Sequence, residues 1–172
     1  MTDGANAGLS GKAKGIRLIA LDVDGVLTDG RIIIDGEGTE SKNFHVRDGL
    51  AIALALRNGM KIALISGRYS KVVEIRAHEL GIRDIHQNAS DKLKIFNAVL
   101  EKHGMAYSEA AFMGDDINDL PVLEKAGLSA APADADENVK KKVDIVTKKN
   151  GGHGAVREVV EFIMTAQKTW GY

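Results

Sequence analysis

The sequence contains no cysteine, which excludes disulfide bonds, a zinc site held by thiolates and catalysis by a thiol. It also lacks a long apolar run. The longest, Leu50–Leu56, is far shorter than the ~20 residues of a membrane-spanning helix, so we expect no membrane partner. Neither sign of charge dominates, since 23 Lys and Arg face 24 Asp and Glu, for a formal net charge of −1. This balance argues against nucleic acid as a partner.

The length leaves little room for a second domain, because 172 residues correspond to one globular domain of typical size, about 100–200 residues. We expect a flexible N-terminal tail over residues 1–15, because this segment has no apolar core, and a single domain over residues 16–172. The same segment does not resemble a signal peptide, and we expect a cytoplasmic protein. An active site in this chain would have no separate lid domain to cover it.

Short apolar segments alternate with helical segments along most of the chain, which predicts an α/β fold with a doubly wound parallel sheet. One interruption follows the first strand, where apolar segments on either side of an Asp-Gly/Glu-Gly turn predict a β-hairpin over residues 31–46. The expected strands span residues 16–22, 61–66, 84–87, 110–114, 128–130 and 144–147, and the expected helices span 50–57, 70–80, 92–103, 120–126 and 155–169.

Charged and hydroxyl side chains follow the ends of several expected strands, where ligands bind in open α/β sheets. These residues are Asp22, Asp24, Ser66, Arg68, Lys92, Asp115, Asp116 and Asp119. Carboxylates from two strand ends would repel each other strongly unless a cation lay between them, and oxygen ligands suit Mg²⁺. Each residue taken alone has a plainer interpretation, since an Asp after a strand is often a helix cap and Ser-Gly is often a turn. Their combination favours a metal-dependent site for a phosphoryl group.

The same residues carry a family resemblance over about Ile16–Thr169. The motifs DVDGVLTDG (residues 22–30), SGR (66–68), Lys92 and GDDIND (114–119) resemble the four motifs of the haloacid dehalogenase superfamily of phosphatases. FHVRDG (44–49) and GGHGAVREV (151–159) are similar to sugar-acid phosphatases of the branch that has no cap domain. The resemblance implies a Rossmann-like sheet with a small hairpin insertion and no cap.

The resemblance also implies a mechanism with Mg²⁺ as cofactor. Asp22 would be the nucleophile that forms an aspartyl-phosphate, and Asp24 would be the general acid and base. Mg²⁺ would be bound by the Asp22 carboxylate, the Asp24 backbone carbonyl and Asp115. Ser66 and Lys92 would hold the phosphoryl oxygens.

In the same resemblance, Asp116 and Asp119 would support the site by orienting Lys92 or metal-bound water. The implied substrate is a phosphorylated sugar acid, 3-deoxy-D-manno-octulosonate 8-phosphate, an intermediate of lipopolysaccharide core synthesis. A guanidinium is the natural partner of its carboxylate, so Arg68 is the first candidate. The expected substrate-binding residues are Asp24, His45, Val46, Arg47, Asp48, Gly49, Arg68, Arg76, Lys92 and Asn118. Where the family pattern would have Asn, Arg and Arg, this chain has His45, Ala53 and His153.

Three other functions fit parts of the pattern. A phosphatase for a nine-carbon nonulosonate 9-phosphate would share most motifs. A phospho-acceptor domain like response-regulator receivers also uses clustered Asp and a Lys, but its acceptor follows a middle strand, and it has no hairpin insertion. A catalytically silent assembly module would not need intact Asp22, Asp24, Lys92 and Asp115.

The expected absence of a cap domain has a consequence for the oligomeric state. Members of the capless branch form tetramers in which neighbouring subunits help to close each site. We therefore expect a homotetramer in which the hairpins pack together and His153 or the C-terminal tail lies near an adjacent pocket. Trp170 and Tyr172 indicate that this tail packs against something.

Overall fold

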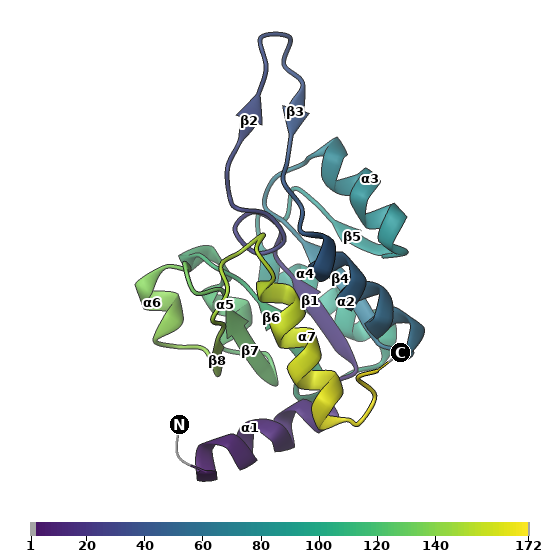
Figure 1. Cartoon of the computed structure of the whole chain (residues 1–172), viewed down its shortest axis with the longest axis vertical. Coiled ribbons are helices and arrows are strands. Elements are labelled where there is room, and N and C mark those ends of the chain that lie inside the picture. The colour runs from purple at the N-terminus through teal and green to yellow at the C-terminus, as the bar shows by residue number, and fades with distance from the viewer. Residues whose placement is uncertain (1–2, 172) are drawn as a thin grey trace.

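The computed structural model describes residues 3–171, with side chains from residue 8 onward. A six-stranded parallel sheet lies at its centre, in the strand order β5-β4-β1-β6-β7-β8 (Figure 1). The doubly wound parallel sheet predicted from the sequence is therefore confirmed. The strands are β1 (Leu18–Leu21), β4 (Lys61–Ile65), β5 (Asp84–His86), β6 (Ala110–Met113), β7 (Leu128–Ala131) and β8 (Ile145–Val146).

Helices cover both faces of the sheet, and the strand sequences show why. Side chains alternate between the faces of a strand, so a strand covered on both sides is apolar throughout. In β1, Ile19 and Leu21 join the buried cluster under one set of helices, whereas Leu18 and Ala20 join the cluster under the other. The first set is α2 (Val46–Arg57), α3 (Lys71–Leu80) and α7 (Ala155–Ala166); the second is α4 (Lys92–His103), α5 (Leu120–Leu123) and α6 (Glu137–Lys140).

The predicted hairpin is present and projects from the body of the molecule (Figure 1). Its paired part is shorter than expected, with β2 (Ile33–Ile34) antiparallel to β3 (Glu40–Ser41). The Asp35 carboxylate accepts hydrogen bonds from the backbone N–H groups of Glu37 and Thr39, which closes the turn. The hairpin carries a row of exposed isoleucines at residues 32–34.

The N-terminal segment differs from the sequence expectation. Residues 3–15 form helix α1 (Asp3–Gly15), so the flexible tail predicted over residues 1–15 is wrong for this part, while residues 1 and 2 lie outside the described range. Ala13 is fully buried, and Gln167 donates hydrogen bonds to the carbonyl oxygens of Ala13 and Ile16, at 3.0 and 2.6 Å. A glycine-rich segment has a low helix propensity, so tertiary contacts stabilise helix α1, and such contacts cannot be predicted from composition.

The opposite end of the chain packs as expected. Trp170 is partly buried against the core, and the Arg157 guanidinium lies 5.0 Å from the centre of its ring. Tyr172 lies outside the described residues. No helix within residues 3–171 combines the length and the apolar character that a bilayer crossing requires.

Candidate active site

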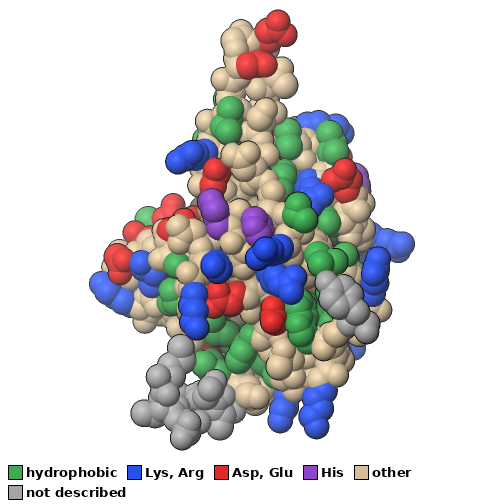
Figure 2. Space-filling model, in the orientation of Figure 1, with side chains coloured by type: hydrophobic (Ala, Val, Ile, Leu, Met, Phe, Trp, Pro, Cys, Tyr) green, Lys and Arg blue, Asp and Glu red, His purple; other side chains and the backbone are tan. Residues whose placement is uncertain are grey.

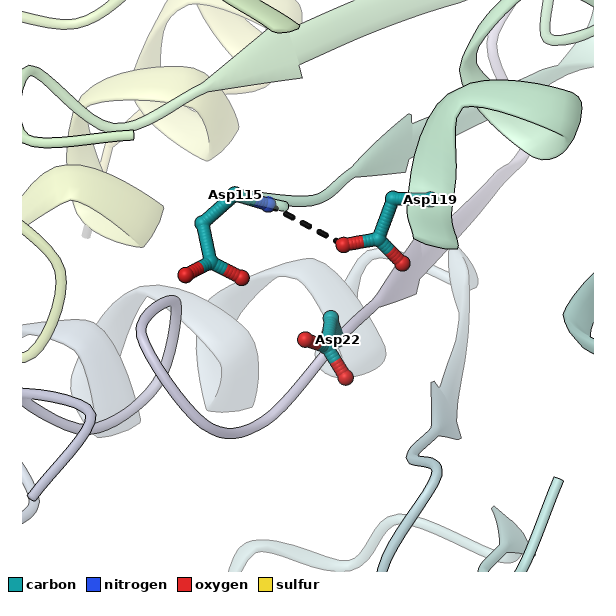
Figure 3. A group of neighbouring side chains, drawn as sticks. All are labelled: Asp22, Asp115 and Asp119. Atoms are coloured by element: carbon teal, nitrogen blue, oxygen red, sulfur yellow. Dashed lines mark hydrogen bonds between the residues drawn. The ribbon is translucent and has the colours of Figure 1, made fainter. Parts of the chain in front are cut away.

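Three carboxylates meet at the carboxyl end of the sheet. Asp22 follows β1 and Asp115 follows β6, and these strands are hydrogen-bonded neighbours. Asp119 lies one turn further on, at the end of the 3₁₀ helix η2 (Ile117–Asp119). Oxygen atoms of the three side chains lie within 4.8 Å of one another, and Figure 3 shows them converging from their separate elements. The convergence that strand ends predict is confirmed for these residues.

Two glycines allow the carboxylates to come this close. Gly25 has φ +87°, and a Cβ placed there would lie 2.0 Å from an oxygen of Asp115. Gly114 likewise leaves space for Asp119, since a Cβ at Gly114 would lie 2.5 Å from the carboxyl carbon of Asp119. Both positions therefore require glycine for the acids to approach the backbone.

The loop after β1 is held from inside by Thr28, which is fully buried. Its hydroxyl donates to the carbonyl oxygen of Val23 at 3.3 Å and accepts from the N–H groups of Gly25 and Gly30. The loop is held from outside by the segment before α7. Gly152 N–H donates to the Val26 carbonyl, at 3.0 Å.

The outer contact is backbone against backbone. A Cβ at Gly151 would lie 1.7 Å from the carbonyl oxygen of Gly25, so no larger residue fits. The glycines of the GGHG motif thus fix the loop that carries Asp22 and Asp24.

Lys92 supplies the positive charge at the centre of the cluster. It begins α4, its side chain is nearly buried, and its Nζ lies 3.0 Å from Asp22 Oδ1 and 2.6 Å from Asp119 Oδ1. The other oxygen of Asp119 accepts from the backbone N–H groups of Asp115 and Asp116, at 3.1 and 3.4 Å. Both Asp119 oxygens are therefore engaged, and the expectation that Asp119 orients Lys92 agrees with this geometry.

One ammonium does not neutralise three carboxylates. Burial and, next, the charge of Asp119 raise the pKa of Asp22 to about 6, against the opposite effect of Lys92. Burial, Asp22 and Asp119 together raise the pKa of Asp115 to about 8. Burial acts to lower the pKa of Lys92, but Asp22 and Asp119 outweigh it and the pKa is raised. The site carries an excess of negative charge that a cation would relieve.

The donor set fits a hard divalent cation. Every candidate ligand is an oxygen, and since Asp119 is already bound to Lys92 and to backbone N–H groups, Asp22 and Asp115 are the side chains left to hold the metal. Oxygen-only coordination with room for water or phosphate suits Mg²⁺. The sequence prediction of a metal-binding acidic cluster is confirmed to this extent.

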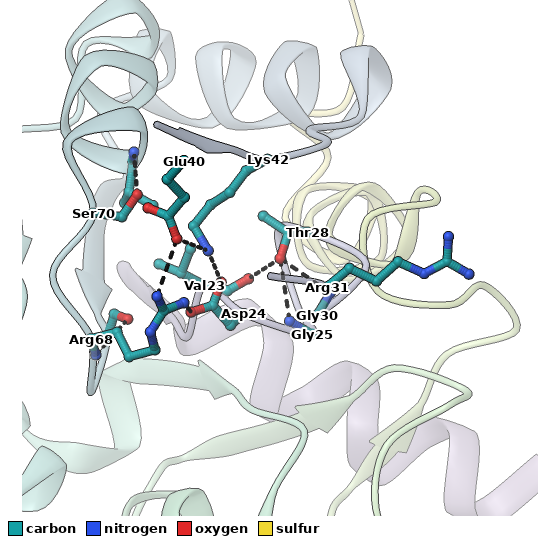
Figure 4. Close-up of polar contacts among 12 residues, drawn as sticks. Val23, Asp24, Gly25, Thr28, Gly30, Arg31, Glu40, Lys42, Arg68 and Ser70 are labelled. Carbon is teal, nitrogen blue, oxygen red and sulfur yellow. Dashed lines mark hydrogen bonds and ion pairs between the residues drawn. The ribbon is translucent and has the colours of Figure 1, made fainter. Parts of the chain in front are cut away.

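Asp24 lies beside the cluster in a second group of charges, shown in Figure 4. One of its oxygens is bound by the ammonium of Lys42, which comes from the hairpin, and the other lies 3.6 Å from Arg68 Nη1. Glu40, also from the hairpin, lies 3.4 Å from the Lys42 ammonium and 3.2 Å from Arg68 Nη2. A hydrogen bond from Ser70 lowers the pKa of Glu40, and Lys42 and Arg68 lower it further.

Ser66 lies where the predicted phosphate-binding role requires it, whereas Asp116 has the helix-capping role. Ser66 is buried at the end of β4, next to β1, and its hydroxyl oxygen accepts from the Arg68 N–H at 3.3 Å. Its position at the strand end agrees with the prediction. Asp116 is exposed and caps η2 by accepting from the Ile117 N–H at 2.7 Å, which is the plainer capping role that an Asp after a strand often has.

Some expected substrate-binding residues have other roles in the structure. Asp48 is buried, and its carboxylate accepts from the N–H groups of Gly154 and Arg157, at 3.2 and 2.7 Å, so it caps the start of α7. Gly49 lies under the Arg76 guanidinium, which would be 2.4 Å from a Cβ there, and Arg76 pairs with Glu79 at 3.0 Å. This geometry does not support substrate contacts from Asp48 and Gly49. It places Arg76 in an ion pair between two residues of α3.

The remaining candidates lie on the outside of the protein, except His45, which is half-buried. Val46, Arg47 and Asn118 are exposed, and His45 lies 3.8 Å from the Asp48 carboxylate. His45 and Arg47 line an open groove of about 1450 Å³ along α7, and none of its lining residues belongs to the acidic cluster. Figure 2 shows basic and histidine side chains gathered on this face.

Lys42 and Glu40 were not among the candidates from the sequence, although one signal could have found them. Residues two apart on a strand share a face, so Glu40 and Lys42 form a charged pair on one side of the hairpin. Which side faces Asp24 depends on how the hairpin folds back over the sheet. Thr28 was missed as well, because its role depends on three hydrogen bonds within its own loop.

A parallel sheet with an Asp after its first strand, a buried Lys beside that Asp and a second acid at the end of the neighbouring strand is the arrangement of a phosphoryl-transfer hydrolase. The profile of the haloacid dehalogenase-like hydrolases matches residues 69–159. The chain belongs to this family, and the match excludes the receiver-like alternative as its class.

Within that family, the chain is similar to the 3-deoxy-D-manno-octulosonate 8-phosphate phosphatase of Escherichia coli K12. The two are 47 % identical over 162 residues, which cover 94 % of this chain and 86 % of the relative. The crystal structure of the Yersinia pestis phosphatase of the same name matches with a TM-score of 0.93 and 41 % identity, over 94 % of this chain and 88 % of that one.

A third relative carries ligands. The phosphatase of that name from Moraxella catarrhalis, solved in complex with a magnesium ion, a phosphate ion and a KDO molecule, matches with a TM-score of 0.92 and 43 % identity. The alignment covers 94 % of this chain and 93 % of that one.

Proposed function

We propose that this protein is a Mg²⁺-dependent phosphatase that hydrolyses 3-deoxy-D-manno-octulosonate 8-phosphate to the free sugar acid and phosphate. The observation that carries the proposal is the group of Asp22, Lys92 and Asp115, in a chain 47 % identical over 94 % of its length to a phosphatase of that specificity. The reaction would place the protein in lipopolysaccharide core synthesis. A cytoplasmic location stays a prediction.

In the proposed reaction the Asp22 carboxylate attacks phosphorus and forms an aspartyl-phosphate as the ester P–O bond breaks. Asp24 gives its proton to the leaving sugar oxygen, then takes a proton from the water that hydrolyses the aspartyl-phosphate, which releases phosphate and restores Asp22. Lys92 and Ser66 hold phosphoryl oxygens through an ammonium and a hydroxyl. When bound by Asp22, Asp115 and the Asp24 carbonyl, Mg²⁺ supplies the positive charge that lets a carboxylate approach a phosphate ester.

The direct test is phosphate release from a panel of sugar phosphates with Mg²⁺. We expect the highest kcat/KM on the eight-carbon ester, and a preference for nonulosonate 9-phosphate would overturn the substrate assignment. Asp22→Asn should abolish turnover while the protein stays folded by circular dichroism, whereas substantial residual activity would remove the nucleophile assignment. A chelator should stop activity and Mg²⁺ should restore it.

We also propose a homotetramer, with the hairpins packed together. The support is the row Ile32, Ile33 and Ile34, which are 56, 42 and 58 % exposed in the single chain, on a segment that projects from the body. A neighbouring subunit would then cover a site that has no cap of its own, with His153 or the C-terminal tail near it. Light scattering on the purified protein tests this, and a fully active monomer would contradict it.

A further inference from the structure

The hairpin contributes a buried cation to the surroundings of Asp24. The Lys42 side chain is fully buried, although it lies on a two-strand insertion that is otherwise largely exposed. Its ammonium is bound by the carboxylates of Asp24 and Glu40. A buried ammonium is costly unless it is paired in this way, so the hairpin is committed to this position over the loop after β1.

The two oxygens of Asp24 are held by cations from different elements. Lys42 binds Oδ1 from the hairpin, and Arg68 approaches Oδ2 at 3.6 Å from the loop after β4. Glu40 contacts both cations, so Asp24, Lys42, Glu40 and Arg68 form a ring of alternating charge whose sum is zero (Figure 4). Ser70 lowers the pKa of Glu40, and its hydroxyl oxygen accepts from the Val73 N–H at the start of α3.

A buried ion pair by itself is weak evidence for a stabilising role, because the loss of hydration offsets the attraction. The position of this one is informative, since it fixes the orientation of the carboxylate that moves a proton in the proposed reaction. We infer that Lys42 is a positioning residue for Asp24, anchored by Glu40, so that the hairpin takes part in leaving-group protonation. This inference rests on the proposed function and extends it to a residue outside the four motifs.

The inference predicts a dependence on the leaving group. A sugar alkoxide needs a proton as it leaves, whereas p-nitrophenolate needs almost none. A misplaced Asp24 should therefore slow phosphoryl transfer from a sugar phosphate to Asp22. It should leave the same step with p-nitrophenyl phosphate nearly unchanged. The pre-steady-state burst of p-nitrophenolate isolates that first step, because hydrolysis of the aspartyl-phosphate follows it.

The experiment compares Lys42→Met with wild type on both esters in Mg²⁺ buffer, with Lys42→Arg as the conservative variant. We expect Lys42→Met to lower kcat on the sugar phosphate by about 100-fold, the scale of a misplaced catalytic group, and to change the burst rate by less than about five-fold. Lys42→Arg should recover most of the loss. Lys71→Met is the matched control, because that ammonium is exposed and pairs with Glu74 instead.

A loss of equal size on both esters, or no loss on either, overturns the inference. If Lys42→Met fails to fold, Glu40→Gln gives the same comparison with a nearly isosteric change, and an unchanged ratio of the two rates would again overturn it. The proposed function is judged separately: wild-type protein that releases phosphate from no sugar phosphate and shows no burst refutes the phosphatase assignment and the inference with it.

Discussion

Replacing Lys92 with Met tests whether this ammonium holds the acidic cluster together. Lys92 Nζ lies 3.0 Å from Asp22 and 2.6 Å from Asp119. At an effective dielectric constant of ~20, each contact corresponds to roughly 5–6 kcal/mol of attraction. The loss of hydration of the buried groups offsets much of this, and removing one partner of a buried pair typically costs about 3–5 kcal/mol.

We therefore expect Lys92→Met to lower the free energy of unfolding by about 3–5 kcal/mol at pH 8 in chelator, and the melting temperature by roughly 6–20 °C. The deficit should shrink as the pH falls from 8 toward about 6, the pKa of Asp22 in wild type, because the loss of Lys92 raises that pKa further and Asp22 then takes up a proton instead of standing unpaired. Mg²⁺ should stabilise the variant more than it stabilises wild type, since it replaces part of the missing positive charge.

Urea unfolding followed by circular dichroism measures these differences. Lys94→Met is the control, because Lys94 lies in the same helix with an exposed side chain. A loss below about 1 kcal/mol at pH 8, equal to that of the control, would refute the idea that Lys92 offsets the repulsion among the carboxylates. Complete loss of turnover in a variant with wild-type stability would assign Lys92 to catalysis alone.

Three further predictions concern the same loops and carboxylates. Gly25→Ala should abolish Mg²⁺ binding measured by calorimetry, because its Cβ would lie 2.0 Å from Asp115. Gly38→Ala is the control, since Gly38 has a similar φ of +85° with open space around it. That variant should lose only about 1–2 kcal/mol through backbone strain and should bind Mg²⁺ normally. In chelator, the free energy of unfolding should fall as the pH rises from about 4 to about 8. The reason is that the raised pKa values of Asp22 and Asp115 make the folded protein bind more protons than the unfolded chain. Saturating Mg²⁺ should abolish this pH dependence, and constant stability over this range in chelator would contradict the raised pKa values. Asp48→Ala should lower the unfolding free energy by about 1–2 kcal/mol through the lost cap of α7, with KM unchanged, and a raised KM would return Asp48 to the substrate site.

The sequence predicted the parts of the site that depend on strand ends. Asp22, Asp115 and Lys92 follow strands whose order in the sheet is constrained by right-handed βαβ connections, so their meeting could be expected without a structure. The family motifs that these residues carry supported the same conclusion.

The parts that depend on how distant segments pack could not be predicted. Asp48 lies in a motif that resembles a substrate loop, yet it caps α7, more than one hundred residues away in the chain. The place of Lys42 beside Asp24 depends on the bend of the hairpin, and helix α1 depends on contacts with α7 that outweigh its glycine content. In each case the deciding partner is remote in sequence.

The contact of Gly151 and Gly152 with the loop after β1 sets an order of events during synthesis. A nascent chain that has reached residue 150 already contains every acid of the site, but it lacks the backbone that presses against Gly25 and Val26. Because synthesis runs from the N-terminus, the loop after β1 is made long before Gly151 and Gly152, the residues that hold it from outside. A nascent chain without these residues should therefore lack the fixed loop that carries Asp22 and Asp24.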